Sequence, residues 1–253
     1  MQHITLFADL SLANVALLLL SSFAGSLMTA SLGVGGGAFL IAVMAGIVPP
    51  LALIPVHGIA QLGSNAGRAW MTRRHASPRV VGVFALGSLL AALLAGFVLG
   101  RLEPGWIPLF VGLFILALTW LPMPKFNHGT HPLGLFSGGL LTTLATMLVG
   151  ATGPLVSAWL GRHGDRWTYT ANFSSCMSVQ HLLKILAFGL AGFAFLPWIP
   201  LLALMILAGY LGTLTGLRIL GRLPDRHFKL LFRIVMTLLA LRAIWVWAQP
   251  LHY

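Results

Sequence analysis

Long apolar stretches, each about the length of a bilayer-crossing helix, follow one another along most of the chain. A helix that crosses the hydrocarbon core needs roughly 20 mostly apolar residues. The segment before the first stretch holds Asp9 and no Lys or Arg, so we expect a span of the mature protein rather than a cleaved signal peptide. The pattern predicts long membrane helices at residues 11–31, 51–71, 79–99, 105–121, 133–149, 167–190, 197–217 and 228–247.

Two further apolar stretches, residues 37–48 and 154–160, are too short to cross a bilayer comfortably. Each directly follows a long stretch and a glycine-rich break, which we call the first break (residues 33–37) and the second break (residues 150–154). The two breaks are separated by one ungapped offset of 117 positions. This offset indicates an internal duplication with repeats of about 10–126 and 127–243. The alternative is chance similarity between two glycine-rich helices. Matches at this offset are Gly33 with Gly150, Gly36 with Gly153, Thr29 with Thr146 and Arg101 with Arg218.

The composition fixes the class of protein. Of 253 residues, 58% are hydrophobic and only 8% are charged, and the mean hydropathy is +0.94. An average soluble domain carries about 25% charged residues, so a single soluble enzyme domain is excluded. The net charge is +11, but the basic residues sit in short gaps between apolar runs, as membrane-flanking anchors do, rather than on a nucleic-acid surface. The one cysteine, Cys176, allows no internal disulfide.

Charge and parity predict the topology. By the positive-inside rule, the basic gaps after span 51–71 and before the last span are both cytoplasmic, and the uncharged gap at 191–196 lies outside. Besides 133–149 and its short partner 154–160, four long spans lie between the basic gaps. Four is an even number, so 133–149 and 154–160 must form a hairpin that begins and ends on one side. The basic residues concerned are Arg68, Arg73, Arg74 and Arg79 around the first gap, and Arg218, Arg222, Arg226, Lys229 and Arg233 around the second.

The duplication predicts a matching hairpin from 11–31 and 37–48 in the first half. Each half then adds three crossings, an odd number, so the halves are inverted relative to each other. The expected fold is therefore an all-α polytopic membrane protein of two inverted repeats. Each repeat is a glycine-tipped helical hairpin plus three membrane-crossing helices, and the whole chain forms a single transmembrane domain.

The glycine breaks are candidate anion sites. Non-helical backbone in a membrane must be buried in protein or line a watery cavity. The short helix after each break has free N–H groups and a positive dipole end at the hairpin tip, which favours an anion. Broken helices at matching positions in two halves also mark transporter binding sites. The alternative is close helix packing through small residues. The candidate residues are Gly33, Gly35, Gly36, Gly37, Gly150, Thr152 and Gly153.

Polar residues inside the spans gather in the two long stretches that follow the short helices. Ionisable groups within a membrane are costly and point to function, although buried helix–helix hydrogen bonding is the plainer explanation for each one alone. Lys184 has no carboxylate in any span interior to neutralise it. It would meet an anion, lose its proton or extend to the interface. The candidate substrate-binding residues here are His57, Gln61, Asn65, Asn172, Ser175, His181 and Lys184.

Two motifs carry a family resemblance. Residues 29–40 read Thr-Ala-Ser-Leu-Gly-Val-Gly-Gly-Gly-Ala-Phe-Leu, which resembles the first glycine motif of TauE/SafE-type sulfite exporters. Residues 149–155 read Val-Gly-Ala-Thr-Gly-Pro-Leu, which is similar to the second motif, with Thr152 where a glycine is usual. The resemblance implies secondary transport of sulfite, organosulfonates or related small sulfur-containing anions. It covers the glycines of both breaks but does not extend to His181 or Lys184.

We therefore expect a secondary transporter, with export favoured, in the inner (plasma) membrane. Its partners are a small anionic substrate and the lipid bilayer, and a homo-oligomer is left open. The alternative is a non-transporting scaffold or assembly subunit whose glycines pack helices. A membrane enzyme fits least, because the spans lack an acid, base or metal constellation. No cofactor or metal motif is present, and the substrate, direction and coupling ion stay open.

Overall fold

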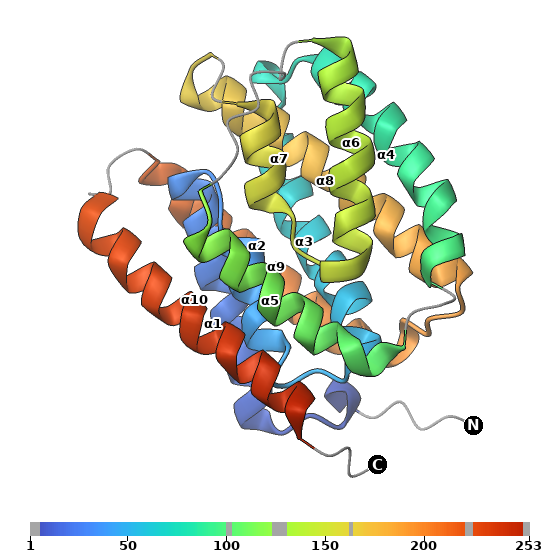
Figure 1. The fold of residues 1–253 in the computed structure, drawn as a ribbon. Helices are drawn as coiled ribbons and strands as arrows, with labels where there is room; N and C mark the ends of the chain where they lie inside the picture. The colour runs from blue at the N-terminus through green and yellow to red at the C-terminus, as the bar shows by residue number, and fades with distance from the viewer. Residues whose placement is uncertain (1–5, 100–102, 123–130, 162–163, 221–224, 250–253) are drawn as a thin grey trace.

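In a computed structural model, the described residues, 6–99, 103–122, 131–161, 164–220 and 225–249, form α- and 3-10 helices and no strand (Figure 1). The 3-10 turns are η1 (Leu6–Asp9), η2 (Arg73–His75), η3 (Pro104–Trp106) and η4 (Leu196–Trp198). The α-helices are α1 (Leu12–Leu32), α2 (Gly36–Met44), α3 (Pro50–Thr72), α4 (Pro78–Leu99), α5 (Ile107–Trp120), α6 (Pro132–Val149), α7 (Gly153–Leu160), α8 (Arg166–Leu190), α9 (Ile199–Arg218) and α10 (Asp225–Ala248).

Six of these helices are long and apolar enough to cross a bilayer, so the chain is an all-helical, multi-pass membrane protein. Two of the predicted spans, α3 and α5, do not meet this requirement of length and apolar composition. Helix α3 has 23 residues, but its polar face makes it less apolar, and α5 has only 14 residues. The six segments that meet the standard of length and composition are Leu12–Leu32, Pro78–Gly96, Pro132–Val149, Arg166–Leu190, Leu196–Arg218 and Leu230–Ala248.

The short helix α2 ends at Met44, four residues before the predicted end at residue 48. Turns follow it, because Gly46 and the Pro49–Pro50 pair do not continue a helix. The division between repeats predicted at 126/127 lies outside the described residues, as do Arg101 and Arg222. Of the link between α9 and α10, residues 219 and 220 are described and residues 221–224 are not.

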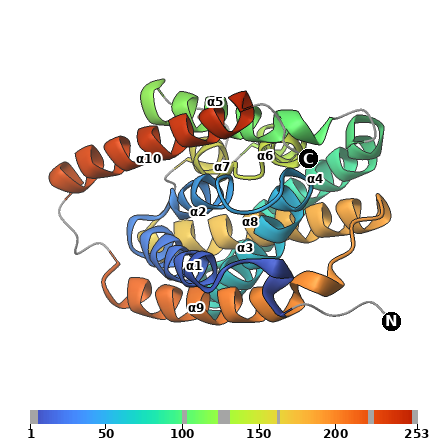
Figure 2. The same cartoon turned by 90° about the horizontal axis from the view of Figure 1, so that it is seen from below.

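Helices of the first half pack on helices of the second half. Helix α1 packs on α9, α4 on α6, α3 on α8, and α5 on α10. In Figure 2, α5 and α10 form one edge of the bundle and α9 the opposite edge, with the short helices α2 and α7 between them. One apolar core surrounds α2 and a second surrounds the contact of α4, α6, α7 and α8. Helix α2 is therefore enclosed by long helices, whereas α7 is buried only at Val156 and Leu160.

Glycines end both long helices that precede the short ones. Helix α1 ends at Gly33 with φ 92°, and Gly35 has φ 107°, a left-handed conformation that only glycine adopts without strain. The Gly36 N–H donates to Thr29 Oγ1 at 3.0 Å, which fixes the start of α2 against α1. Helix α6 ends at Gly150 with φ 76°, and α7 begins at Gly153. The expected breaks and the short helices after them are present.

One end of the bundle gathers the link after α3, the start of α8 and the end of α9. Ser77 N–H donates to Asn172 Oδ1 at 2.7 Å, and Arg166 donates to the Leu220 carbonyl at 3.0 Å. We call this the basic end, because Arg73, Arg74, Arg166 and Arg218 cluster there. Helix α8 ends at the opposite side of the bundle, where residues 191–196 follow it. We call this side the uncharged end, after these residues.

Asp165 caps helix α8 at the basic end. Its Oδ1 accepts from the backbone N–H of Thr168 at 2.7 Å and of Trp167 at 2.8 Å. These bonds, chiefly the one from Thr168, hold the pKa of the Asp165 carboxyl below its usual value, because they stabilise the ionised form. The cap fixes where the longest helix of the second half begins.

Candidate functional site

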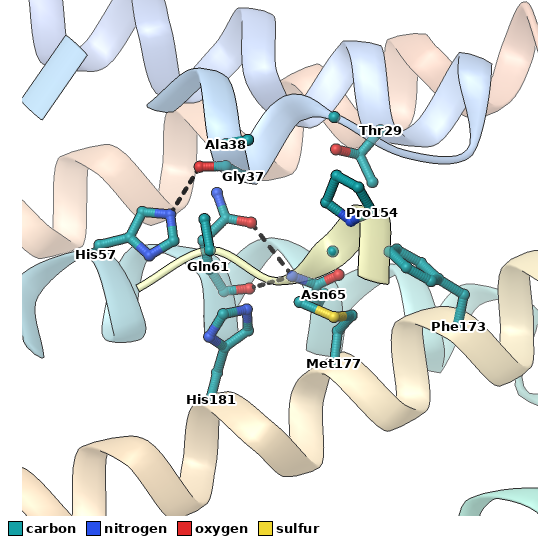
Figure 3. A pocket seen from close by; sticks show the side chains of 13 residues that line it. Thr29, Gly37, Ala38, His57, Gln61, Asn65, Pro154, Phe173, Met177 and His181 are labelled. Carbon is teal, nitrogen blue, oxygen red and sulfur yellow. Dashed lines mark hydrogen bonds between the residues drawn. The ribbon is translucent and has the colours of Figure 1, made fainter. Parts of the chain in front are cut away.

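A small cavity lies where the two glycine breaks meet α3 and α8 (Figure 3). It takes residues from both hairpins and from both of the long helices that follow them. Segments far apart in the sequence therefore enclose one space. The lining residues are Thr29, Gly35, Gly37, Ala38, His57, Gln61, Asn65, Ala151, Gly153, Pro154, Phe173, Met177 and His181.

The cavity is closed in this conformation. The space open to the centre of a water molecule is about 10 Å³. A single water needs roughly 10–15 Å³ of such space. An anion larger than water therefore enters only if the surrounding helices move apart.

Two helix N-termini border the cavity. Gly35 is the N-cap of α2, and Gly153 is the first residue of α7. Neither helix has a side-chain hydrogen bond at its N-cap. Thr152 is the N-cap of α7 and has φ −111°, so the second break does not need a glycine at position 152. The residue with positive φ in this break is Gly150. Both positive dipole ends face the same small space.

Helix α3 presents His57, Gln61 and Asn65 to the cavity, four residues apart and so on one face. His57 Nε2 lies 2.9 Å from the carbonyl oxygen of Gly37 and donates to it, because a carbonyl can only accept. The other ring nitrogen, Nδ1, is buried without a partner. Asn65 Nδ2 donates to the Gln61 carbonyl at 2.9 Å. This face is ordered by hydrogen bonds to α2 and within α3.

Across the cavity from α3, helix α8 contributes Phe173, Met177 and His181, which are also spaced four residues apart (Figure 3). The rings of His181 and His57 are 6.0 Å apart, edge to face. His181 is fully buried, and neither of its ring nitrogens has a hydrogen-bond partner. A buried imidazole without partners costs free energy, so its retention needs a reason beyond packing.

Lys184 is fully buried beside the second break and does not reach the interface. Its Nζ donates to the Gly150 carbonyl at 2.7 Å and to Thr146 Oγ1 at 3.4 Å. Its Cε packs so closely on α3 that a Cβ added at Gly58 would lie 3.0 Å away. The cation thus sits just behind the cavity lining, one turn beyond His181.

The structure brings half of the predicted site residues into the lining: Gly35, Gly37, His57, Gln61, Asn65, Gly153 and His181. Gly33, Gly36 and Gly150 shape the breaks behind it. Thr152 Oγ1 lies 3.4 Å from Gln180 Oε1, in a buried network with Thr142 and Thr143.

Two predicted site residues on α8 lie elsewhere. Asn172 accepts the bond from Ser77 at the basic end, and Ser175 is not among the lining residues. The cavity itself includes residues that the sequence did not single out: Thr29, Ala38, Ala151, Pro154, Phe173 and Met177. Their spacing before His181 is the one signal that pointed to Phe173 and Met177.

Arg68 differs from the other basic residues counted around the gap after α3. It lies inside α3, as the predicted span 51–71 already placed it, and it is only 1% exposed. It follows Asn65 by three residues, so it shares the polar face of α3, and this spacing was the available signal. Arg68 Nη1 donates to Asn65 Oδ1 at 3.2 Å and Nη2 to Ser64 Oγ at 3.1 Å.

The comparisons with known proteins agree with this architecture at the level of the family. The family model described as "Sulfite exporter TauE/SafE" matches residues 17–243, nearly the whole chain. Searches of curated proteins and of solved structures found no match. The matched family consists of membrane transporters of sulfur-containing anions, not of enzymes. The chain belongs to the TauE/SafE sulfite exporter family.

Proposed function

We propose that this protein is a secondary transporter that exports sulfite, organosulfonates or related small anions across the inner (plasma) membrane. The anion binds in the cavity between the N-termini of α2 and α7. One observation carries the proposal: two helix N-termini border one buried cavity whose lining includes no carboxylate. At α2 the Gly36 N–H donates to Thr29 Oγ1, whereas α7 has no side-chain hydrogen bond at its N-cap. Helix N-termini favour negative charge through their free N–H groups and dipoles.

The side chains around the cavity suit an anion as well. His181 offers an unpartnered imidazole, and Gln61 offers an amide from the facing helix. Lys184 lies one turn away and supplies positive charge that no carboxylate cancels. Its ammonium has three donors, of which two are engaged. The acidic residues of the chain, Asp9, Glu103, Asp165 and Asp225, all lie outside the interiors of the long helices.

The division into two inverted repeats fits the contacts between halves. Ser22 Oγ donates to the Met205 carbonyl at 2.7 Å, between α1 and α9. Ser88 Oγ donates to the Gly139 carbonyl at 3.4 Å, between α4 and α6. Gly139 lies 117 positions after Ser22, and Met205 lies 117 after Ser88. The two bonds are therefore reciprocal under the offset found in the sequence.

The cavity lining also pairs the two halves, although at α3 and α8 the offset is one residue shorter than 117. His57, Gln61 and Asn65 on α3 correspond to Phe173, Met177 and His181 on α8, each pair 116 positions apart. The two helices run in opposite directions, because the end of α3 meets the start of α8 through Ser77 and Asn172. A site at such a repeat interface suits alternating access, in which one half rocks against the other.

Orientation follows from charge: the basic end faces the cytoplasm and the uncharged end faces outward. The cavity here has room for about one water, which is too little for the anion. Transport therefore requires conformations in which the surrounding helices lie farther apart. Opening toward one end at a time moves the anion without a continuous pore.

The alternative is a scaffold in which the glycines only pack helices. Gly36 fits that description, because a Cβ there would overlap the carbonyl of Gly25. Gly153 does not, since a Cβ there meets only Phe173 Cζ at 3.6 Å, an ordinary contact. A glycine that packing does not require, at a helix N-terminus on a cavity, favours the binding site.

The proposal is tested by a thermal-shift screen of the purified protein against sulfite, sulfate, sulfoacetate, taurine and carboxylates. A ligand that binds only the folded state stabilises it by about 2.7 kcal/mol at 100 times its Kd. We expect sulfite or a sulfonate to stabilise the wild type and to leave the matched Gly153→Leu variant unshifted. The absence of any anion-dependent shift in the wild type contradicts an anion site.

A further inference from the structure

Arg68 holds the position on α3 that Lys184 holds on α8. Each lies three residues beyond the last cavity-lining residue of its helix, Asn65 and His181 respectively, and the two cations are 116 positions apart. The same 116-residue correspondence relates the lining residues of the two helices. Each half therefore buries one cation next to the cavity.

The guanidinium of Arg68 is buried without an anion. The side chain is 1% exposed, its two hydrogen-bond acceptors are the neutral Asn65 and Ser64, and its Nε has no partner. Desolvating an arginine without a carboxylate costs several kcal/mol, so such an arginine is retained for a purpose other than stability. The unpartnered, buried Nε–H is an open donor for an anion.

The two breaks differ in which group donates to their glycine carbonyl. At the second break the Gly150 carbonyl accepts from Lys184 at 2.7 Å. At the first break the corresponding carbonyl, that of Gly33, accepts instead from the Tyr169 hydroxyl at 3.5 Å. The hydrogen-bond acceptors of Arg68 are therefore side chains, whereas Lys184 also has a backbone carbonyl of the break.

The two cations also lie on opposite sides of the cavity. Helix α3 runs toward the basic end and α8 away from it, so Arg68 lies between the cavity and the basic end, and Lys184 lies toward the uncharged end. Figure 3 shows Asn65 on the side of Phe173, and His57 with His181 on the other side. An anion leaving the cavity toward the basic end would pass Arg68.

We infer that Arg68 is a second anion-binding residue, which receives the transported anion between the basic end and the central cavity, as the counterpart of Lys184 on the other side. The inference rests on the proposed function. The site takes a small oxyanion such as sulfite or a sulfonate, because a guanidinium matches planar pairs of oxygens. Ser64 and Asn65 orient the guanidinium, and Nε–H and the remaining Nη–H groups bind the anion.

The test measures sulfite flux into and out of proteoliposomes sorted for one protein orientation, so that KM is obtained from each face. Arg68→Met removes the charge and keeps much of the stem. Arg68→Gln also removes the charge but keeps an amide donor for Ser64 and Asn65, so it serves if the methionine variant does not fold. Arg68→Lys keeps the charge. The matched control is Arg73→Gln, which removes an exposed charge from the same end.

We expect Arg68→Met and Arg68→Gln to raise KM about tenfold or more for sulfite arriving from the basic end, while KM from the uncharged end stays unchanged. Arg68→Lys should recover part of the loss, and Arg73→Gln should behave as wild type. A folded Arg68→Gln protein with wild-type KM from both faces overturns the inference, as does an equal loss from both faces, which marks a structural role. A wild type that moves neither sulfite nor sulfonates overturns the proposed function instead, and the inference with it.

Discussion

Lys184 Nζ donates a 2.7 Å hydrogen bond to the carbonyl oxygen of Gly150, the residue at which α6 ends. The ammonium therefore sits at the negative end of the α6 dipole, where a cation is favourable. This contact explains how a lysine stays buried without a carboxylate. It also ties a candidate anion-binding cation to the backbone of the second break, so that movement of the break and charge at the cavity are coupled.

Lys184→Met should weaken both the fold and the binding of anions. The variant removes the hydrogen bond from the ammonium to the Gly150 carbonyl, which contributes about 1.5–3 kcal/mol of unfolding free energy, while Thr146 Oγ1 still donates to that carbonyl at 3.0 Å. Loss of the charge should lower sulfite affinity by about tenfold, or 1.4 kcal/mol. Thermal unfolding with and without sulfite separates the two effects, and Lys184→Arg should retain part of the affinity. Affinity equal to wild type in a folded Lys184→Met preparation limits Lys184 to a structural role.

Substitution of His181 should affect sulfite affinity but not reduce stability. His181→Phe removes an imidazole whose two buried nitrogens have no partners, so stability should be unchanged or increased. Sulfite affinity should fall about tenfold, because the cavity loses a donor that no neighbour replaces. Unfolding midpoints and titration with sulfite provide the measurement. A large loss of stability with unchanged affinity would assign His181 to the core rather than to the site.

The glycine positions separate binding from packing. Gly153→Leu places a side chain in the cavity but requires no backbone shift at its Cβ, so the protein should fold and lose sulfite binding. Gly36→Leu should fail to fold well, because its Cβ overlaps the Gly25 carbonyl. The sequence alone predicts that both leucine variants insert and fold, and the structure retains that expectation only for Gly153. Expression, gel filtration and binding of both variants check the contrast, and unimpaired binding by Gly153→Leu contradicts the site.

Particular residues show how far sequence reasoning reaches. The breaks were predictable, because runs such as Gly35–Gly37 cannot continue a helix within a membrane. The face of His57, Gln61 and Asn65 was predictable from its spacing alone.

Other parts of the site depend on tertiary packing, and the sequence marks them only by their spacing along a helix. Phe173 and Met177 look like ordinary core residues until α8 is placed against α3. Arg68 looks like a basic anchor at a helix end, because only its depth in the bundle distinguishes burial from exposure.

The topology can be checked without knowledge of the substrate. In a Cys176→Ser background, a cysteine at position 194 should react with a membrane-impermeant thiol reagent added outside intact cells. A cysteine at position 75 should react only after the cells are opened, because the basic end faces the cytoplasm. Labelling of position 75 from outside, with position 194 silent, reverses the orientation and removes the basis for calling the protein an exporter.

The most direct measurement of the central claim is the flux of radiolabelled sulfite across proteoliposomes that contain the wild type or Gly153→Leu. The account predicts saturable movement by the wild type, inhibited by excess unlabelled sulfite. It predicts a rate equal to that of protein-free vesicles for the variant, although the variant is folded. Equal saturable rates for both proteins, or no movement by either, contradict an anion site between the N-termini of α2 and α7.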